Sequence, residues 1–230
     1  MAAAAPPMLS DLVDRAVELA AEWHDGTYRK GRWRPQPFAP PAGEHSRVPA
    51  MAHVTSVALM VQRAGWEDEV VAAAFLHDVL EDANRFGQRM TPEALAAHVG
   101  PRVVALVQAV SEPVAADGGA LPWRARKEGY LRRLRAGPPE AAAIALADKV
   151  HNAYVMTGAL EAGANIFRRE AGHTALSAGP EAQRWFLEAA LGATAHHDDA
   201  RLGPMRARLR EHLARFAAAA EAFARDAPGD

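Results

Sequence analysis

Residues 70–82 read VVAAAFLHDVLED, and the rest of the fold can be inferred outward from this stretch. Its first seven residues are apolar on every side of a helix, which predicts a central helix over about 67–82. Polar side chains follow at once: His77, Asp78, Glu81 and Asp82. Residues four apart share a helix face, so three carboxylates and an imidazole would crowd together. An unpaired buried charge costs several kcal/mol, and a divalent cation would remove that cost.

A second stretch, AAAIALADKVHN at residues 141–152, repeats the pattern of an apolar run that ends in an acid. Asp148 follows seven apolar residues and needs a cation or several hydrogen-bond donors. A third polar residue, His53, lies in an apolar helical segment 24 residues before His77. Together with Asp78 these residues form a mixed nitrogen and oxygen set. Such a set suits Mn²⁺, Fe²⁺ or Zn²⁺ and does not suit Ca²⁺ or a thiophilic metal.

The composition narrows the class of protein. Of the 230 residues, 50% are hydrophobic, 23% are charged and none is cysteine. The absence of cysteine excludes disulfides, thiolate zinc sites and a cysteine nucleophile. A formal net charge of -2 gives no reason to expect a nucleic-acid partner, and no segment is apolar enough for a membrane span. Abundant alanine favours helix, so we expect an all-α protein. Because the sequence shows neither a membrane span nor a signal peptide, we expect a cytoplasmic location.

Capping residues, prolines and glycines divide the chain into predicted helices. These are expected at about 11–25, 50–64, 67–82, 92–99, 101–110, 122–135, 138–160, 180–196 and 204–225. Residues 1–9 are interpreted as a disordered lead-in, and residues 10–230 as one helical domain. A Pro-rich loop at 31–49 is expected to be inserted in it, because no residue run there alternates with a period of two.

The order His53, His77-Asp78, Asp148 resembles the HD superfamily of metal-dependent phosphohydrolases. Within it, FLHDVLED (75–82) and LADKVHN (146–152) are similar to motifs of the RelA/SpoT hydrolase domain and of the small alarmone hydrolases. HDGTYRK (24–30) resembles a further stretch of that family, His-x-Gly-Gln-x-Arg-Lys. The similarity covers about residues 12–192. The chain departs from the family at 49–54, which lack its aromatic and second proline, at Ala83 in place of threonine, and at Val155 in place of a small hydroxyl residue.

The resemblance implies an HD-domain helical bundle around one Mn²⁺, with Fe²⁺ or Zn²⁺ as alternatives. The expected reaction is hydrolysis of (p)ppGpp to GDP or GTP and pyrophosphate, with no synthetase activity. It implies four metal ligands, His53, His77, Asp78 and Asp148. It also makes Glu81 and Asp82 the acid/base pair, places Arg29 and Lys30 against the nucleotide, and Asn152 against the ribose. The partner is then a small-molecule nucleotide, and a homo-oligomer stays open.

A basic segment contains Arg124, Arg126, Lys127, Arg132, Arg133 and Arg135. Lys127 could steer a polyanionic nucleotide into the site. The alternative, which we favour slightly, is a solvated helix face whose buried stripe contains Trp123, Tyr130, Leu131 and Leu134. His196 and His197 are interpreted as a surface cluster rather than a second metal site.

Two other functions remain open at the level of sequence. The first is an HD-domain nucleotidase that acts on another nucleotide, such as an adenine alarmone or a phosphorylated dinucleotide. The second is a nucleotide sensor without activity. The presence of Glu81 and Asp82 argues against the sensor, because a pure binding protein needs no proton-transferring group beside its metal.

Overall fold

The structure is a computed structural model that describes residues 8–35, 45–113, 121–168 and 175–226. The predicted lead-in at 1–9 lies mostly outside these ranges, as does the central part of the predicted Pro-rich loop. The protein is all-α apart from one small β-ribbon. The helices are α1 (Asp11–Trp23), α2 (Ala50–Arg63), α3 (Asp68–Phe75), α4 (Pro92–Val99), α5 (Pro101–Val110), α6 (Trp123–Ala136), α7 (Pro139–Glu161), α8 (Pro180–Thr194) and α9 (Leu202–Asp226).

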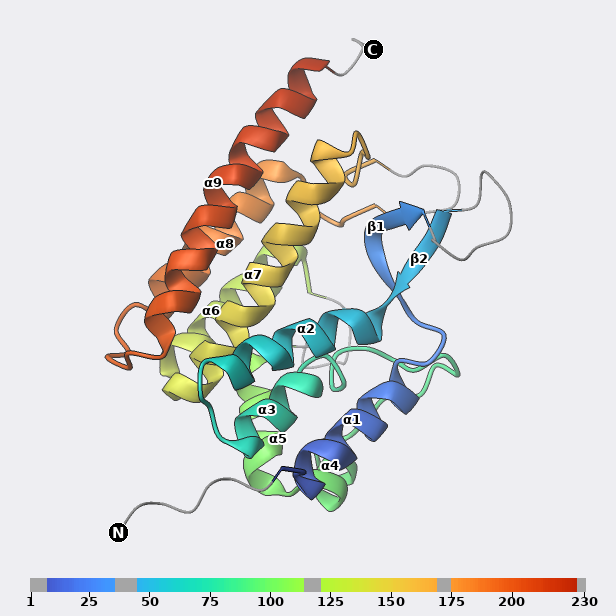
Figure 1. Cartoon of the computed structure of the whole chain (residues 1–230), viewed down its shortest axis with the longest axis vertical. Coiled ribbons are helices and arrows are strands. Elements are labelled where there is room, and N and C mark those ends of the chain that lie inside the picture. The colour runs from blue at the N-terminus through green and yellow to red at the C-terminus, as the bar shows by residue number, and fades with distance from the viewer. Residues whose placement is uncertain (1–7, 36–44, 114–120, 169–174, 227–230) are drawn as a thin grey trace.

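The long helix α7 occupies the centre of the molecule (Figure 1). It packs against α2, α3, α5, α6, α8 and α9, and its residues 141–150 are all buried. Alanine at half of these positions keeps the helix thin, so neighbouring helices approach it from every side. The long helix α9 lies alongside α7 over much of its length. A charged residue on α7 is therefore enclosed by protein, as the sequence pattern requires.

Local signals set several helix boundaries. Ser10 accepts a hydrogen bond from the Val13 amide at 3.4 Å, and Thr91 accepts one from Ala94 at 3.2 Å. Pro92 follows Thr91 at the first position of α4, where its missing N–H is harmless. These short-range features confirm the predicted starts of α1 and α4. In the described part of the chain, none of the helices combines the length and the hydropathy that a bilayer crossing requires.

The predicted helix over 67–82 is wrong in its second half, because α3 ends at Phe75. The Leu76 amide is shared between the carbonyls of Ala72 and Ala73, both at 3.2 Å, and residues 76–81 continue as turns. The amides of Glu81 and Asp82 both bond to the carbonyl of Asp78, at 3.1 and 2.9 Å. Side chains on such turns do not follow the spacing of a regular helix. Of the two expected pairs of residues four apart, His77 and Glu81 still line one cavity, whereas Asp82 is exposed and does not line it with Asp78.

The predicted loop at 31–49 contains β-structure. Strands β1 (Tyr28–Pro35) and β2 (His45–Pro49) pair antiparallel, with Trp33 opposite Arg47 and an irregularity between Tyr28 and Trp33. The sequence does not alternate there, because the ribbon is not one half-buried face of a larger sheet. Prolines at the strand ends suit such an isolated ribbon. β2 leads directly into α2, and the ribbon contacts α7, which places β1 beside the centre of the bundle.

Candidate metal centre

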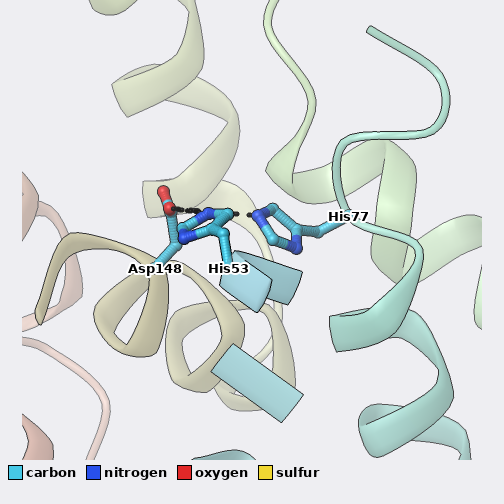
Figure 2. A group of neighbouring side chains, drawn as sticks. All are labelled: His53, His77 and Asp148. Atoms are coloured by element: carbon cyan, nitrogen blue, oxygen red, sulfur yellow. Dashed lines mark ion pairs between the residues drawn. The ribbon is translucent and has the colours of Figure 1, made fainter. Parts of the chain in front are cut away.

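Three side chains from distant parts of the chain converge beside α7 (Figure 2). His53 comes from α2, His77 from the turns after α3, and Asp148 from α7, and one ligand atom of each lies within 4.8 Å of the others. His53 Nε2 is 3.0 Å from Asp148 Oδ1, and His77 Nε2 is 3.9 Å from the same oxygen. Asp78 approaches the same point, since its Oδ1 is 3.2 Å from His77 Nε2. The structure therefore brings all four expected ligands together.

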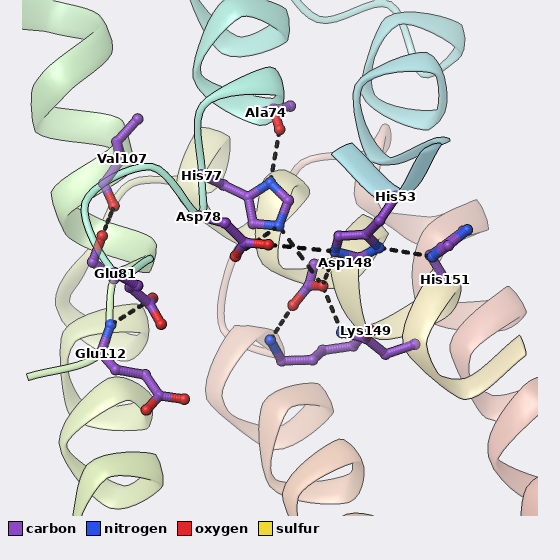
Figure 3. Close-up of polar contacts among 12 residues, drawn as sticks. His53, Ala74, His77, Asp78, Glu81, Val107, Glu112, Asp148, Lys149 and His151 are labelled. Atoms are coloured by element: carbon purple, nitrogen blue, oxygen red, sulfur yellow. Dashed lines mark hydrogen bonds and ion pairs between the residues drawn. The ribbon is translucent and has the colours of Figure 1, made fainter. Parts of the chain in front are cut away.

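The two imidazoles are oriented so that one nitrogen of each is held and the other faces the shared point (Figure 3). His77 Nδ1 lies 2.8 Å from the Ala74 carbonyl, and His53 Nδ1 lies 2.8 Å from His151 Nδ1. Both rings are at most 4% exposed, and among the described residues neither Nε2 has a partner in hydrogen-bonding geometry. Burial, followed by the nearby Arg29 guanidinium, lowers the pKa of His53 to about 4. A neutral buried imidazole with an unused lone pair fits a bound divalent cation.

Asp148 is prepared as an anionic ligand. Burial alone would raise its pKa, but the Lys149 ammonium and the two imidazoles overcome that effect and hold the pKa of Asp148 well below its usual range. Asn152 Nδ2 donates to Oδ1 at 2.6 Å, and Lys149 forms an ion pair with Oδ2. The Lys149 Nζ also lies 4.6 Å from the centre of the Tyr130 ring. The sequence pattern located the carboxylate and missed the lysine as its buried counter-ion.

Glu81 lines the same cavity from the turns after α3. Its Oε1 accepts a hydrogen bond from the Glu112 amide at 2.8 Å. Burial, then the carboxylates of Asp78 and Glu112, raise the pKa of Glu81 to about 8. Asp82 is exposed and is not among the described residues that line the cavity, and its carbonyl accepts a bond from Trp23 Nε1 at 3.0 Å. The two adjacent acids therefore occupy different environments.

The residues that were expected to bind substrate differ in whether the structure places them in the cavity wall. Arg29 and Asn152 line the cavity and bond to each other across 123 positions of sequence. Lys127 also lines it and forms an ion pair with Glu112, which Arg126 contacts as well. The side chain of Lys30 lies outside the described residues. The volume of the cavity is about 230 Å³. The polar residues that line it form one half, and the other half is lined by apolar side chains: Val155, Met156, Ile166, Leu176, Phe186 and Leu187.

The basic segment fits the solvated-face interpretation over most of its length. Tyr130 and Leu134 are buried, while Arg124 pairs with Glu128 at 2.9 Å on the exposed side. Lys127 is the exception, because its side chain is 18% exposed and it faces the cavity. In the described part of the chain, the group of His, Asp and Glu side chains that could hold a metal is the one around His53, and His196 and His197 are not in it.

The family model for the HD domain matches residues 36–173, which is more than half of the chain. This chain belongs to the HD domain family. A guanosine-3′,5′-bis(diphosphate) 3′-pyrophosphohydrolase of Aquifex aeolicus (strain VF5) is 28% identical to it over 149 residues. That match covers 64% of this chain and 18% of the relative, so the chain spans only a small part of that protein's length.

Solved structures show the same architecture. A crystal structure from Listeria monocytogenes EGD-e superposes on this HD domain with a TM-score of 0.59 at 25% identity, covering 76% of this chain and 99% of that one. A metazoan orthologue of SpoT, described as hydrolysing ppGpp, superposes with a TM-score of 0.63 at 20% identity. That superposition covers 91% of this chain and 98% of the other, and it shows a shared fold.

His151 is a residue of this HD domain whose role the sequence reasoning missed. If His53 Nε2 faces a cation, its Nδ1 carries the proton and donates to His151 Nδ1. Such a bond fixes both the tautomer and the direction of a ligand ring. The signal that could have revealed it is the position of His151, one helical turn after Asp148 on a helix that is buried on nearly all sides.

Replacement of His151 by alanine is expected to lower the affinity for a divalent cation by about 10- to 100-fold, because His53 loses the contact that orients it. Asparagine at the same position keeps a side-chain acceptor and should restore part of the affinity. Competition with a chelating dye measures both variants without reference to catalysis. An unchanged metal affinity in His151→Ala would show that His53 needs no such support.

Proposed function

We propose that this HD domain is a metal-dependent phosphohydrolase that cleaves the 3′-diphosphate of (p)ppGpp, giving GDP or GTP and pyrophosphate. The observation that supports this most strongly is the convergence of His53, His77, Asp78 and Asp148 in a cavity that also contains Glu81. The relationship to a guanosine-3′,5′-bis(diphosphate) 3′-pyrophosphohydrolase supports the choice of substrate. Mn²⁺ is the proposed cation, with Fe²⁺ and Zn²⁺ as the alternatives to test.

Those four residues would hold the cation, which when bound lowers the pKa of water and offsets phosphate charge. Glu81 supplies the proton transfer. Because Oε1 accepts the Glu112 amide, Oε2 is the oxygen left to take up and release a proton, and burial beside the carboxylates of Asp78 and Glu112 raises the pKa of Glu81 in the metal-free protein. As the water oxygen adds to the phosphorus it gives a proton to Glu81, the bond to the 3′-oxygen breaks, and the departing 3′-oxygen takes that proton from Glu81.

The rest of the cavity is suited to a nucleotide. Arg29 and Lys127 bring positive charge to the polar half, where the phosphates of the substrate would lie. Glu112 also lines the cavity and pairs with Lys127, so it offsets part of this charge while it holds the ammonium in the cavity wall. The apolar half, with Met156, Ile166 and Leu176, offers a surface for a base or sugar.

The deciding experiment is a panel of nucleotides incubated with the protein and Mn²⁺, analysed for pyrophosphate and orthophosphate separately. The panel contains ppGpp, its adenine counterpart and a 3′-phosphorylated dinucleotide. We expect pyrophosphate from ppGpp at the highest kcat/KM, and no release by Asp148→Asn. Preference for another member of the panel would assign a different nucleotide, and tight binding of ppGpp without turnover in Mn²⁺, Fe²⁺ or Zn²⁺ would favour the sensor.

A further inference from the structure

A second cavity, of about 300 Å³, lies on another face of α7 from the metal centre. We call it the α2/α7/α9 groove, because α2 contributes Leu59 and Arg63, α7 contributes His151 and Tyr154, and α9 contributes Arg208 and His212. In Figure 1, α9 runs beside α7, and α2 crosses α7 near its middle. His151 therefore lines the groove with one part of its ring and contacts His53 of the metal centre with Nδ1.

The charge of the groove is positive. Arg63 belongs to the last turn of α2 and is exposed, and no carboxylate partner of it occurs in the described part of the chain. Arg208 contacts Glu211 at 2.7 Å, but that pair is about half exposed and so is weakly held. No Asp or Glu is among the described residues that line the groove. Two guanidinium groups with only one weak counter-ion between them attract an anion.

His212 supplies the second, independent observation. Its side chain is only 2% exposed, yet its Nδ1 has no hydrogen-bond partner among the described residues. Burial, followed by the Arg208 guanidinium, lowers the pKa of His212, so the ring is neutral at neutral pH and can place its single proton on Nδ1. A buried polar atom without a partner is uncommon in folded proteins and points to a missing ligand or water.

Tyr154 adds an aromatic surface at the same place. The residue is 49% exposed, and its ring stands edge-on to His212 at 5.6 Å between centroids. A large aromatic side chain held half in solvent beside two arginines can stack a planar group while the arginines bind a charge. The volume of the groove lies at the lower end of the range that small-molecule sites occupy.

We infer that the α2/α7/α9 groove is a binding site for a phosphate-bearing ligand of nucleotide size. Arg63 and Arg208 bind the phosphate, the ring of His212 forms part of the wall beside it, and the ring of Tyr154 stacks against the base. This site is separate from the catalytic cavity and does not depend on the proposed hydrolase activity. It adjoins the metal centre through His151, which lines the groove and contacts His53.

The test is an NMR titration of the full, metal-free chain with GMP and, separately, with orthophosphate, following the imidazole resonances of His212. Both ligands should shift these resonances, and GMP should bind more tightly. Arg63→Gln should lower the affinity for both ligands about tenfold, because a charge-assisted hydrogen bond is lost. Tyr154→Ala should lower the affinity for GMP and leave the affinity for orthophosphate unchanged. Glu211→Gln should raise the affinity for both ligands, because Arg208 loses its competing partner.

The matched control is Arg210→Gln, which removes the same charge from an exposed position on α9 outside the groove. Its effect should be much smaller than that of Arg63→Gln. The site assignment is overturned if neither ligand moves the His212 resonances at millimolar concentration, or if the two arginine variants behave alike. Equal affinity for GMP and orthophosphate, or a GMP affinity indifferent to Tyr154→Ala, would overturn the assignment to a nucleotide.

Discussion

Replacement of Asp148 by asparagine is expected to remove bound metal and hydrolytic activity together. The Oδ1 atom of Asp148 lies 3.0 Å from His53 Nε2 and 3.9 Å from His77 Nε2, and the pKa of the carboxyl is held low, so it is an anion whenever the site is formed. Asparagine keeps the size of the side chain but loses the charge that a divalent cation requires. We expect metal affinity to fall by about 100-fold or more and turnover to become undetectable.

Asparagine and alanine at position 148 both remove the counter-ion of the buried Lys149, a loss that costs about 3–5 kcal/mol of stability, so the folding of each variant is checked. Alanine is the less informative change, because it also removes the side-chain oxygen that accepts from Asn152. Asp198→Asn is the matched control, since Asp198 is exposed and follows His196 and His197. Elemental analysis of the purified proteins decides the question: full metal occupancy in Asp148→Asn would show that the ligand assignment is wrong.

Replacement of Glu81 by glutamine should separate metal binding from catalysis. The amide retains the acceptor for the Glu112 N–H but cannot transfer a proton. We therefore expect wild-type metal affinity with kcat reduced by about 100-fold or more. Glu221→Gln, an exposed change on α9, is the control. If Glu81→Gln lost metal as well as activity, Glu81 would be a ligand or a support of the ligands.

The same variant should stabilise the metal-free protein in a pH-dependent way. Below a pH of about 4, Glu81 is protonated in both the folded and the unfolded chain, so the substitution changes little. Above that, the unfolded carboxyl ionises while the folded one, with its pKa of about 8, keeps its proton, and the native glutamate lowers stability as pH rises. Glutamine removes this cost, on the order of 3 kcal/mol at pH 7. Chemical denaturation at several pH values measures it, and a difference that is constant with pH would contradict the raised pKa.

The sequence located the proposed metal ligands because they violate a local rule. Asp148 ends a run of apolar residues on a helix that the structure buries on nearly all sides, and His77 follows another such run. A charge at such a place needs a partner whatever the details of the fold. The placement of Lys149 could not be predicted in the same way, because nothing in the sequence shows whether its flexible side chain turns back to Asp148 or reaches solvent.

The sequence by itself determined that the protein is helical, and it predicted that His53, His77, Asp78 and Asp148 act together. These conclusions rest on helical periodicity and on the cost of burying charge, both of which act over a few residues. The tertiary structure alone decided that α3 ends at Phe75, that β1 and β2 form a ribbon, that Glu81 enters the cavity while Asp82 is exposed, and that His151 supports His53. Such features depend on hydrogen bonds and packing between segments up to 123 residues apart, whose geometry is fixed only when the whole bundle assembles.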